Sequence, residues 1–415
     1  PLGEDLVGDQ LWFATFNSDG FVGDHLTVNW LYKPYFNVRA RRYRFRILNS
    51  DVSRFMRLAL VVAREPGKGE FKGEDFSVSY DRVPFHMIAN DGNVMEHAVP
   101  FDGSMDLDGD GDKDDHHGVL PTLSIAERYD IVVDFSEFDP GDRIYMVNLL
   151  EHTDGRGPER EISLEDILGG TSDSCDSAVG KFFEIRVNEY SSKDLSLDPH
   201  DYVPGKKVMI PLPAVTEEEI RSAVNHTFRF GSGGLTDSRP RGISSDYYPA
   251  PHDNGYIEAP DGSGLGVELP NILRHQPTQA NGLAELVESC HGYDLEETDE
   301  HMLDIGLDFS GYMNDVPNFS IGEKESAILE FHPDRIWGIG SDGGLPYAGD
   351  LHRVSAAPVM GGLEVWHLEN DSSMWSHNIH IHFEEGRILR RDGKAPPEWE
   401  KWARKDVYRL GNMDD

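Results

Sequence analysis

The sequence predicts an all-β protein made of Greek-key β-sandwich domains, two in this chain, with a long irregular insertion in the second. Three observations support this class. Short segments of alternating apolar and polar residues follow one another along the first half, as half-buried strands do. The chain has 42 glycines and 24 prolines, which favour turns over long helices. Its 415 residues are too many for one ordinary core, and a hydrophobic content of 38% is enough to build packed interiors.

The strands of the first half are predicted from their alternation. In YRFRILNS, Tyr43, Phe45 and Ile47 face one way while Arg44 and Arg46 face the other. The segments RFMRLALV and ERYDIVVDF repeat this period of two, and PFHMIANDGNVM predicts a strand that runs into a turn at Asp-Gly. The segments GDRIYMVNLL and KFFEIRVNEY add two more strands. We therefore expect a first domain over residues 1–195.

A second domain is expected over residues 196–415, beginning near PGKKVMIPL. Thr216 and Glu219 form the pattern of a capping box, which predicts a short helix ending near Val224. The residues from about 231 to 315 are rich in Gly, Pro, Asp and Ser, and we interpret them as an insertion. Strands are expected in VNHTFRFG, SAILEFH, GLEVWHLEN and HNIHIHF.

The charge balance limits the partners. Lys and Arg number 38 and Asp and Glu number 75, so the formal net charge is −37. Such a field repels nucleic acid and anionic membranes and attracts cations, so no nucleic-acid partner is expected. A solvated acidic coat suited to a salty or extracellular medium explains the same charge. No apolar run of about 18 residues predicts a membrane span.

Two features of the sequence concern the cellular compartment of the protein and its processing. Cys175 and Cys290 are the two cysteines, and they could pair in an oxidising compartment. The chain opens on PLGEDLVGDQ, without an initiator Met or a signal sequence. We expect that a signal was removed or that the chain is a piece of something longer.

Three histidines lie close together in SHNIHIHFEEG. On a strand, His380 and His382 would share one face and His377 would point to the other. This division suits two neighbouring metal sites served by one strand, and neutral imidazole favours copper, zinc, iron or nickel. The alternative is three histidines satisfied by hydrogen bonds at a sheet edge, which is less favoured because each buried ring needs its own partner.

Longer motifs around these histidines resemble a known family. The stretch LEVWHLENDSSMWSHNIHIHFEEGRILRRDG resembles the third copper motif of multicopper oxidases. The stretches TVNWLYKPYFNVRARRYRFRILNSDVSRFMRLAL and LSIAERYDIVVDFSEF resemble the middle cupredoxin domain of the spore-coat laccase and bilirubin oxidase branch. The resemblance covers residues 20–150 and 321–411. It implies cupredoxin-like domains, with residues 1–195 as the middle domain and 196–415 as an incomplete C-terminal copper domain.

The resemblance also implies roles for the histidines. His377 would be a ligand of type 1 copper, His380 of type 2 copper and His382 of type 3 copper, the last two in a trinuclear centre that reduces O2 to water. Asn378 stands where the family usually has Pro. The family's two His-x-His motifs and its final His-Cys-His motif have no counterpart here. We therefore expect that this chain alone lacks a complete copper centre, and that further parts of the same protein or another chain supply the missing ligands.

Two functions follow as hypotheses. The first is a laccase-like multicopper oxidase that couples one-electron oxidation of phenols, aromatic amines or a metal ion to four-electron reduction of O2. Family resemblance places it outside the cytoplasm, whether secreted, periplasmic or at the cell surface. The second is a copper-free, calcium-stabilised cupredoxin-type sandwich with a surface or assembly role. The missing motifs favour the second, and the retained histidine triplet opposes it.

An acidic loop over residues 102–118 contains MDLDGDGDKDDHHG. Its alternate aspartates have the spacing that calcium requires, and Gly111 stands where an EF-hand-like loop turns sharply. The twelfth position is His117 and not Glu, so this is not a full EF-hand. A bound calcium and a merely solvated loop both remain open. The candidate calcium ligands are Asp106, Asp108, Asp110, Asp112 and Asp114.

Overall fold

The fold is given by a computed structural model of the chain, which divides into two units that are described separately. The first, which we call the sandwich unit, contains Gly20–Ala214 and Asn378–Asp415, and the second, the sheet unit, contains Pro1–Asp19 and Val215–His377. The residues described are 22–23, 25–65, 76–153, 155–233, 256–257, 267–268, 336–341, 347–348, 358–370, 375–382 and 384–411.

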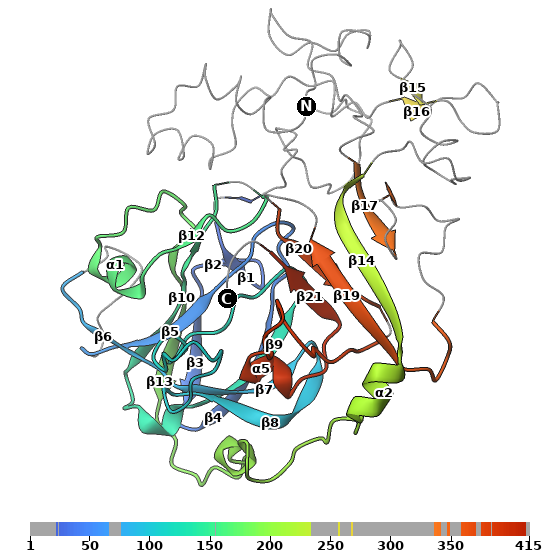
Figure 1. Cartoon of the computed structure of the whole chain (residues 1–415). Helices are drawn as coiled ribbons and strands as arrows, with labels where there is room; N and C mark the ends of the chain where they lie inside the picture. The colour runs from blue at the N-terminus through green and yellow to red at the C-terminus, as the bar shows by residue number, and fades with distance from the viewer. Residues whose placement is uncertain are drawn as a thin grey trace, which may run out of the picture. The chain divides into compact units, whose positions relative to one another are not determined.

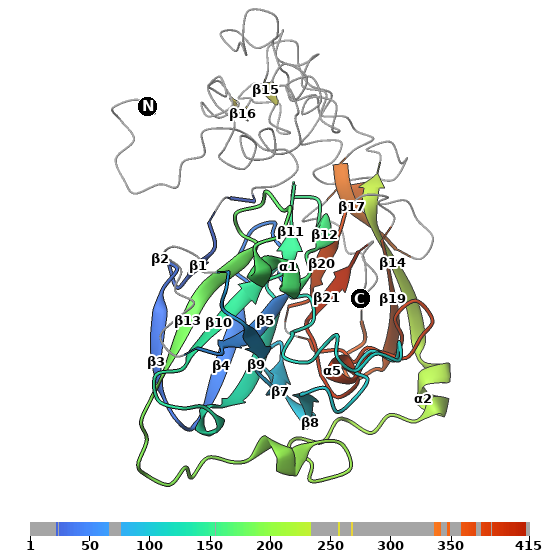
Figure 2. The same cartoon turned by 90° about the vertical axis from the view of Figure 1, so that its left-hand side faces the viewer.

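Two antiparallel-rich sheets make up most of the sandwich unit (Figure 1, Figure 2). The first has the order β3-β13-β10-β5-β6, with β3 (Tyr35–Arg39), β13 (Gly180–Asn188), β10 (Arg143–Asn148), β5 (Leu58–Ala63) and β6 (Tyr80–Arg82). The second has the order β4-β9-β7-β8, with β4 (Arg42–Leu48), β9 (Arg128–Asp134), β7 (Phe85–Asn90) and β8 (Asn93–Phe101). Smaller elements are β1 (Thr27–Val28), β2 (Leu31–Tyr32), η1 (Phe135–Glu137), β11 (Leu150–Glu151), β12 (Arg160–Glu161), α1 (Leu164–Gly169) and η2 (Pro199–Tyr202).

One hydrophobic core lies between these two sheets. It contains alternate residues of β5 and β10 from one sheet and of β7 and β9 from the other. The predicted alternation of β4 is confirmed, because Tyr43, Phe45 and Ile47 are half-buried while Arg44 and Arg46 are exposed. The all-β sandwich class predicted from the sequence is thereby confirmed for this unit.

Strand β5 differs from the half-buried strand expected of RFMRLALV. It begins at Leu58, and all six of its residues are buried. Leu58 and Leu60 enter the central core, whereas Ala59 and Val61 belong to a second hydrophobic cluster that includes Leu164 of α1. The strand is apolar on both faces because residues distant in sequence cover its outer face.

Two local predictions are confirmed. Asp91 and Gly92 join β7 to β8 with φ angles of 49° and 83°, as a two-residue hairpin turn needs. The helix α2 (Glu217–Ser222) begins with a capping box between Thr216 and Glu219. The hydroxyl of Thr216 accepts from the backbone N–H of Glu219, 3.2 Å away.

The C-terminal segment belongs to the sandwich unit and packs on its core. It contains the short helix α5 (Glu398–Lys401) and β21 (Val407–Leu410), which pairs with β20 (His377–His380). Trp399 of α5 is buried in the central core. Lys405 is fully buried, with its Nζ 2.6 Å from Glu127 Oε1 and 3.1 Å from Asp91 Oδ2. These contacts join residues near the end of the chain to the sheet formed by its first half.

The sheet unit contains a four-stranded sheet in the order β18-β17-β14-β19. Its strands are β14 (Val224–Gly233), β17 (Ile336–Ser341), β18 (Tyr347–Ala348) and β19 (Glu364–Asn370), and a separate pair is β15 (Tyr256–Ile257) with β16 (Val267–Glu268). Most of the expected insertion, and the strand expected in SAILEFH, lie outside the described residues. The predicted domains 1–195 and 196–415 stay a prediction. No described helix has the length and apolar character needed to cross a membrane.

Candidate metal centres

The histidine triplet lies at β20. The strand spans His377 to His380, and His382 follows it in a turn. The rings of His380 and His382 lie edge to face with their centroids 4.7 Å apart, so the structure brings these two together. His377 belongs to the sheet unit and is half-buried. Burial lowers its pKa, which keeps the imidazole in the neutral form that binds metals.

A carboxylate lies beside His380. The Oδ1 atom of Asp406 is 3.6 Å from His380 Nε2. Arg128 donates to both oxygens of Asp406, at 2.7 and 2.8 Å. Burial alone would raise the pKa of Asp406, but the hydrogen bonds and charge of Arg128 lower it, so this carboxylate is held ionised.

Asn378 has a structural role where the multicopper oxidase motif has Pro. Its side-chain Nδ2 donates to the backbone oxygen of Ile125, 3.0 Å away. The backbone N–H of Ile381 donates to the carbonyl of Asp406 at 2.8 Å. These bonds hold the segment that carries His380 in place within the sandwich unit.

The acidic loop lies between β8 and β9. Both carboxylate oxygens of Asp106 accept backbone N–H groups, one from Gly109 at 2.8 Å and one from Gly111 at 3.0 Å. Gly111 has a φ of 102°, which an L side chain rarely adopts, so the expected sharp turn occurs at this residue.

Three of the five candidate calcium ligands come together. Asp106, Asp108 and Asp110 offer oxygen atoms that all lie within 4.8 Å of one another. The carboxylate of Asp112 accepts from the N–H of Asp114 at 2.8 Å, and neither residue belongs to that group. The donor set is made of hard carboxylate oxygens, which fits calcium.

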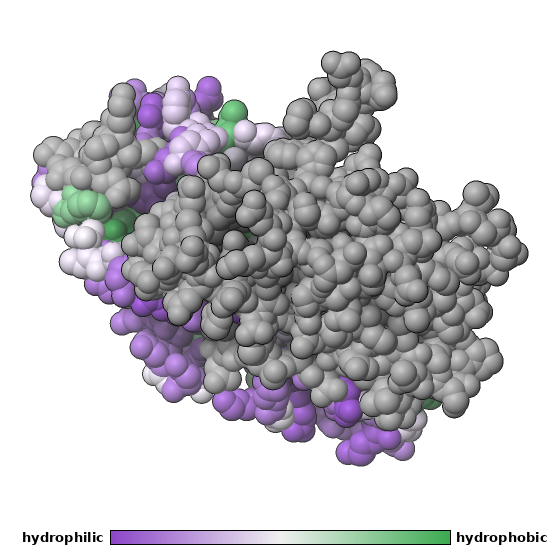
Figure 3. All heavy atoms as spheres, turned by 90° about the horizontal axis from the view of Figure 1, so that it is seen from above, coloured by the Kyte–Doolittle hydropathy of each residue, from purple (hydrophilic) through white to green (hydrophobic). Residues whose placement is uncertain are grey.

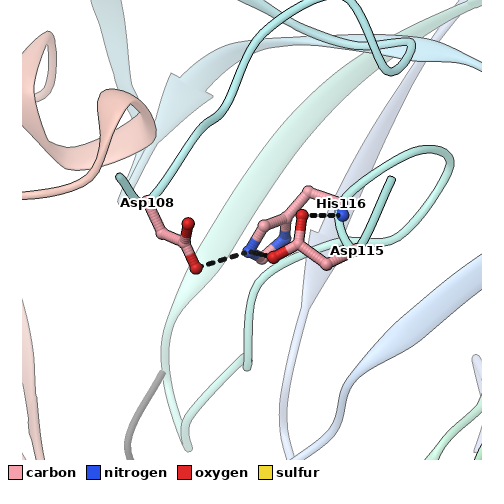
Figure 4. A group of neighbouring side chains, drawn as sticks. All are labelled: Asp108, Asp115 and His116. Carbon is pink, nitrogen blue, oxygen red and sulfur yellow. Dashed lines mark hydrogen bonds and ion pairs between the residues drawn. The ribbon is translucent and has the colours of Figure 1, made fainter. Parts of the chain in front are cut away.

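A second group in the same loop was not expected from the sequence. Asp108, Asp115 and His116 offer ligand atoms within 4.8 Å of one another (Figure 4). Asp115 and His116 were missed because the sequence argument followed only alternate aspartates from Asp106. The available signal was a histidine directly after a run of aspartates. Among the described residues, the groups of three or more possible metal donors all lie in this loop.

The described surface is polar on one face, and the chain as a whole is acidic. On the face shown in Figure 3, the described residues are mostly hydrophilic, with a few hydrophobic side chains among them. Together with a formal charge of −37, this surface favours the approach of cations.

Comparison with known proteins gives the same family as the motifs. A bilirubin oxidase of Albifimbria verrucaria is 29% identical over 218 residues, which is 52% of this chain and 29% of that protein. A laccase of Haloferax volcanii is 29% identical over 231 residues, 52% of this chain and 30% of that protein. The chain spans less than a third of the length of these curated relatives. No family model matches the chain.

Solved structures of multicopper oxidases are also similar. McoA from the hyperthermophile Aquifex aeolicus has 21% sequence identity and a TM-score of 0.33, over 54% of this chain and 35% of that one. A multicopper oxidase from Pediococcus acidilactici has 19% identity and a TM-score of 0.29, over 52% of this chain and 30% of that one.

The sequence relatives are multicopper oxidases. Over about half of its length, this chain is related to the bilirubin oxidase and laccase members of that class, which confirms the resemblance seen in the motifs.

Proposed function

We propose that this chain is part of a laccase-like multicopper oxidase that couples one-electron oxidation of a phenol, an aromatic amine or a metal ion to reduction of O2 to water. The observation that carries the proposal is the histidine segment at β20, in a chain related to laccases and bilirubin oxidase. His380 and His382 would each contribute an imidazole to the trinuclear copper centre, and His377 one to type 1 copper.

The described residues fit copper as a partial ligand set. The two imidazole rings at 4.7 Å are donors that copper accepts, and Asp406 lies near one of them as an outer carboxylate. Type 1 copper also needs a thiolate, which the histidine segment does not supply. The remaining ligands would come from other parts of the protein or from another chain. When bound, copper supplies the electron transfer, while this chain orients the rings and holds Asp406 ionised through Arg128.

Oxygen uptake by the full-length protein tests the proposal. We expect copper-dependent O2 consumption with a phenolic donor, lost in His380→Ala and His382→Ala and retained in His25→Ala, an exposed histidine in the loop before β1. Copper-loaded full-length protein that consumes no O2 with phenols, aromatic amines or Mn(II) would overturn it. Retained activity in both His380→Ala and His382→Ala would also overturn it.

Calcium is proposed as a second ligand, held by Asp106, Asp108 and Asp110, with Asp112 and Asp114 later in the same loop. The turn at Gly111 and the hydrogen bonds to Asp106 support an EF-hand-like geometry. Calorimetric titration with calcium should give heat that disappears in Asp110→Asn and persists in Asp102→Asn. The absence of binding heat at millimolar calcium would refute the proposal that this loop binds calcium.

The place of action is also a proposal. An extracytoplasmic site, whether secreted, periplasmic or at the cell surface, agrees with the acidic charge and with the usual location of the resembling family. Fractionation of the producing cells tests this location. Protein found only in the cytoplasmic fraction would contradict an extracytoplasmic site.

A further inference from the structure

The group formed by Asp108, Asp115 and His116 contains a nitrogen donor as well as carboxylates. The Nε2 atom of His116 lies 3.7 Å from Asp108 Oδ2 and 3.6 Å from Asp115 Oδ2. Figure 4 shows both carboxylates directed toward the imidazole ring. Such a mixed set differs from the all-oxygen group of Asp106, Asp108 and Asp110, although the two groups share Asp108.

Packing fixes the direction of the imidazole. The side chain of His116 is 3% exposed, and its ring centroid lies 4.6 Å from that of Trp399 and 6.2 Å from that of Phe101. The two carboxylates are more exposed, at 20% for Asp108 and 26% for Asp115. The nitrogen donor is therefore held by the core, while the oxygen donors lie where a cation from solvent can reach them.

The distances fit a shared ion better than a hydrogen bond. Nitrogen–oxygen hydrogen bonds span about 2.7–3.2 Å, so 3.6 and 3.7 Å are too long. Ligand atoms about 2.0–2.2 Å from a tetrahedral zinc ion lie about 3.3–3.6 Å from each other. The observed separations are thus close to those that a metal would impose, and small side-chain movements complete the fit.

Charge supports the same conclusion. Burial is the main cause that raises the pKa of Asp115 to about 6, and the charges of Asp108 and Asp110 act in the same direction, while the hydrogen bond from the backbone N–H of His116 lowers it. A divalent cation between these groups would offset the repulsion. Imidazole is a poor ligand for calcium and a good one for zinc and its neighbours in the first transition row.

We propose that Asp108, Asp115 and His116 bind a divalent transition-metal ion of the zinc class, at a site separate from the copper-binding histidines. The ion would join the two arms of the acidic loop, which itself contacts the C-terminal segment because His116 packs on Trp399 and the N–H of Glu398 donates to Leu107 O at 2.8 Å. The site is structural, and it requires no copper.

Zinc titration of the full 415-residue chain tests this site. The chain should carry His377→Ala, His380→Ala and His382→Ala, so that these imidazoles do not bind zinc. We expect one zinc equivalent, with affinity lowered by at least about tenfold in Asp115→Asn and in His116→Gln, since even outer-sphere changes at metal sites cost that much. Asp102→Asn removes the same charge from the loop outside both groups and should leave zinc binding unchanged.

Cobalt(II) absorption gives a second reading of the same site. Cobalt in the zinc position should show visible bands that are lost in His116→Gln. Because His116 is buried, circular dichroism checks that His116→Gln is folded. If His116→Gln does not fold, Asp115→Asn, which changes a more exposed side chain, is used in its place. Absence of stoichiometric zinc binding, or zinc affinity unchanged in both Asp115→Asn and a folded His116→Gln, would overturn the proposal. Zinc binding lost in Asp110→Asn but kept in Asp115→Asn would do the same.

Discussion

Lys405 is a buried cation surrounded by acceptors. Its Nζ lies 2.6 Å from Glu127 Oε1, 2.7 Å from Asn90 Oδ1 and 3.1 Å from Asp91 Oδ2. The pKa of Lys405 is raised, because the charges of Glu127 and Asp91 outweigh the effect of burial. A buried ion pair adds little to the free energy of unfolding compared with apolar residues of the same volume. Removal of one partner is costly, because it leaves the other charge buried without compensation.

Replacement of this cation should therefore be severe. We expect Lys405→Met to lower the free energy of unfolding by about 3–5 kcal/mol, measured by urea denaturation. Lys401→Met removes a lysine whose side chain is 47% exposed and paired with Glu398, and should have little effect. Equal effects of the two substitutions would show that burial of the lysine is not the cause.

His152 is a buried base within a second ionic group. Its ring Nε2 accepts from the backbone N–H of Phe55 at 3.1 Å, and the backbone N–H of His152 donates to Asp176 Oδ2 at 2.9 Å. Asp176 also pairs with Arg54, and both side chains are 1% exposed. Burial, and then the charge of Arg54, lower the pKa of His152 from 6.5 to about 3.

The pH dependence of stability follows from that pKa. Below about pH 6.5 the unfolded chain binds a proton at this histidine and the folded chain does not until about pH 3. As the pH is lowered from about 6.5 to about 3, proton binding at His152 in the unfolded chain should therefore decrease the free energy of unfolding by roughly 1 kcal/mol per pH unit. His152→Gln should flatten the slope measured by denaturation from pH 7 to 4, and His25→Gln should not. An unchanged slope in His152→Gln would refute the assignment.

The half-buried state of β4 could be predicted from the sequence, whereas the cover on both faces of β5 could not, although a strand was expected there. The alternation in β4 directly reports its half-buried state. In β5, Ala59 and Val61 are covered by Leu164 and other residues that are distant in sequence, and no local pattern reports this cover. The hairpin at Asp91-Gly92 and the capping box at Thr216 were predictable because their signals are short and local.

The end of α1 offers a test of backbone geometry. Gly170 has a φ of 70°, and a Cβ there would lie 2.6 Å from the ring of Phe76. Gly170→Ala should lower the free energy of unfolding by about 1–2 kcal/mol, since an L side chain disfavours the left-handed region. The neighbouring Gly169 is helical, with Thr171 Oγ1 the nearest atom at 3.9 Å, so Gly169→Ala should be neutral or stabilising. Thermal unfolding of both variants decides, and equal destabilisation would contradict the prediction.

The acidic charge of the whole chain predicts stabilisation by salt. With a formal charge of −37, repulsion between surface carboxylates opposes the compact state. The screening length falls from about 10 Å at 0.1 M salt to about 3 Å at 1 M. We expect the unfolding temperature to rise between these concentrations of KCl, and to rise less with sucrose of equal osmolality. A lower unfolding temperature at 1 M KCl would contradict this.

The candidate sites were predictable only in part. The spacing of His380 and His382 placed them on one side, and their rings are in contact. Of the five alternate aspartates predicted as calcium ligands, three offer oxygens that come together. His116 had a signal in the sequence, a histidine after a run of aspartates, but the direction of its ring could not be predicted because it depends on Trp399, which lies far along the chain. Sequence spacing reports which donors lie along one segment, and tertiary packing sets the direction in which they point.

The sandwich unit is made from two pieces of chain, and this affects how it can form during synthesis. Lys405 meets Glu127 across a sequence separation of 278 residues. At about 5–20 residues per second, the ribosome needs on the order of ten seconds to make residues 215–377 before the second piece emerges. During that interval Glu127 lacks Lys405 and Asp91 keeps only Arg128, so the nascent sandwich should stay open to proteases until the C-terminal segment docks.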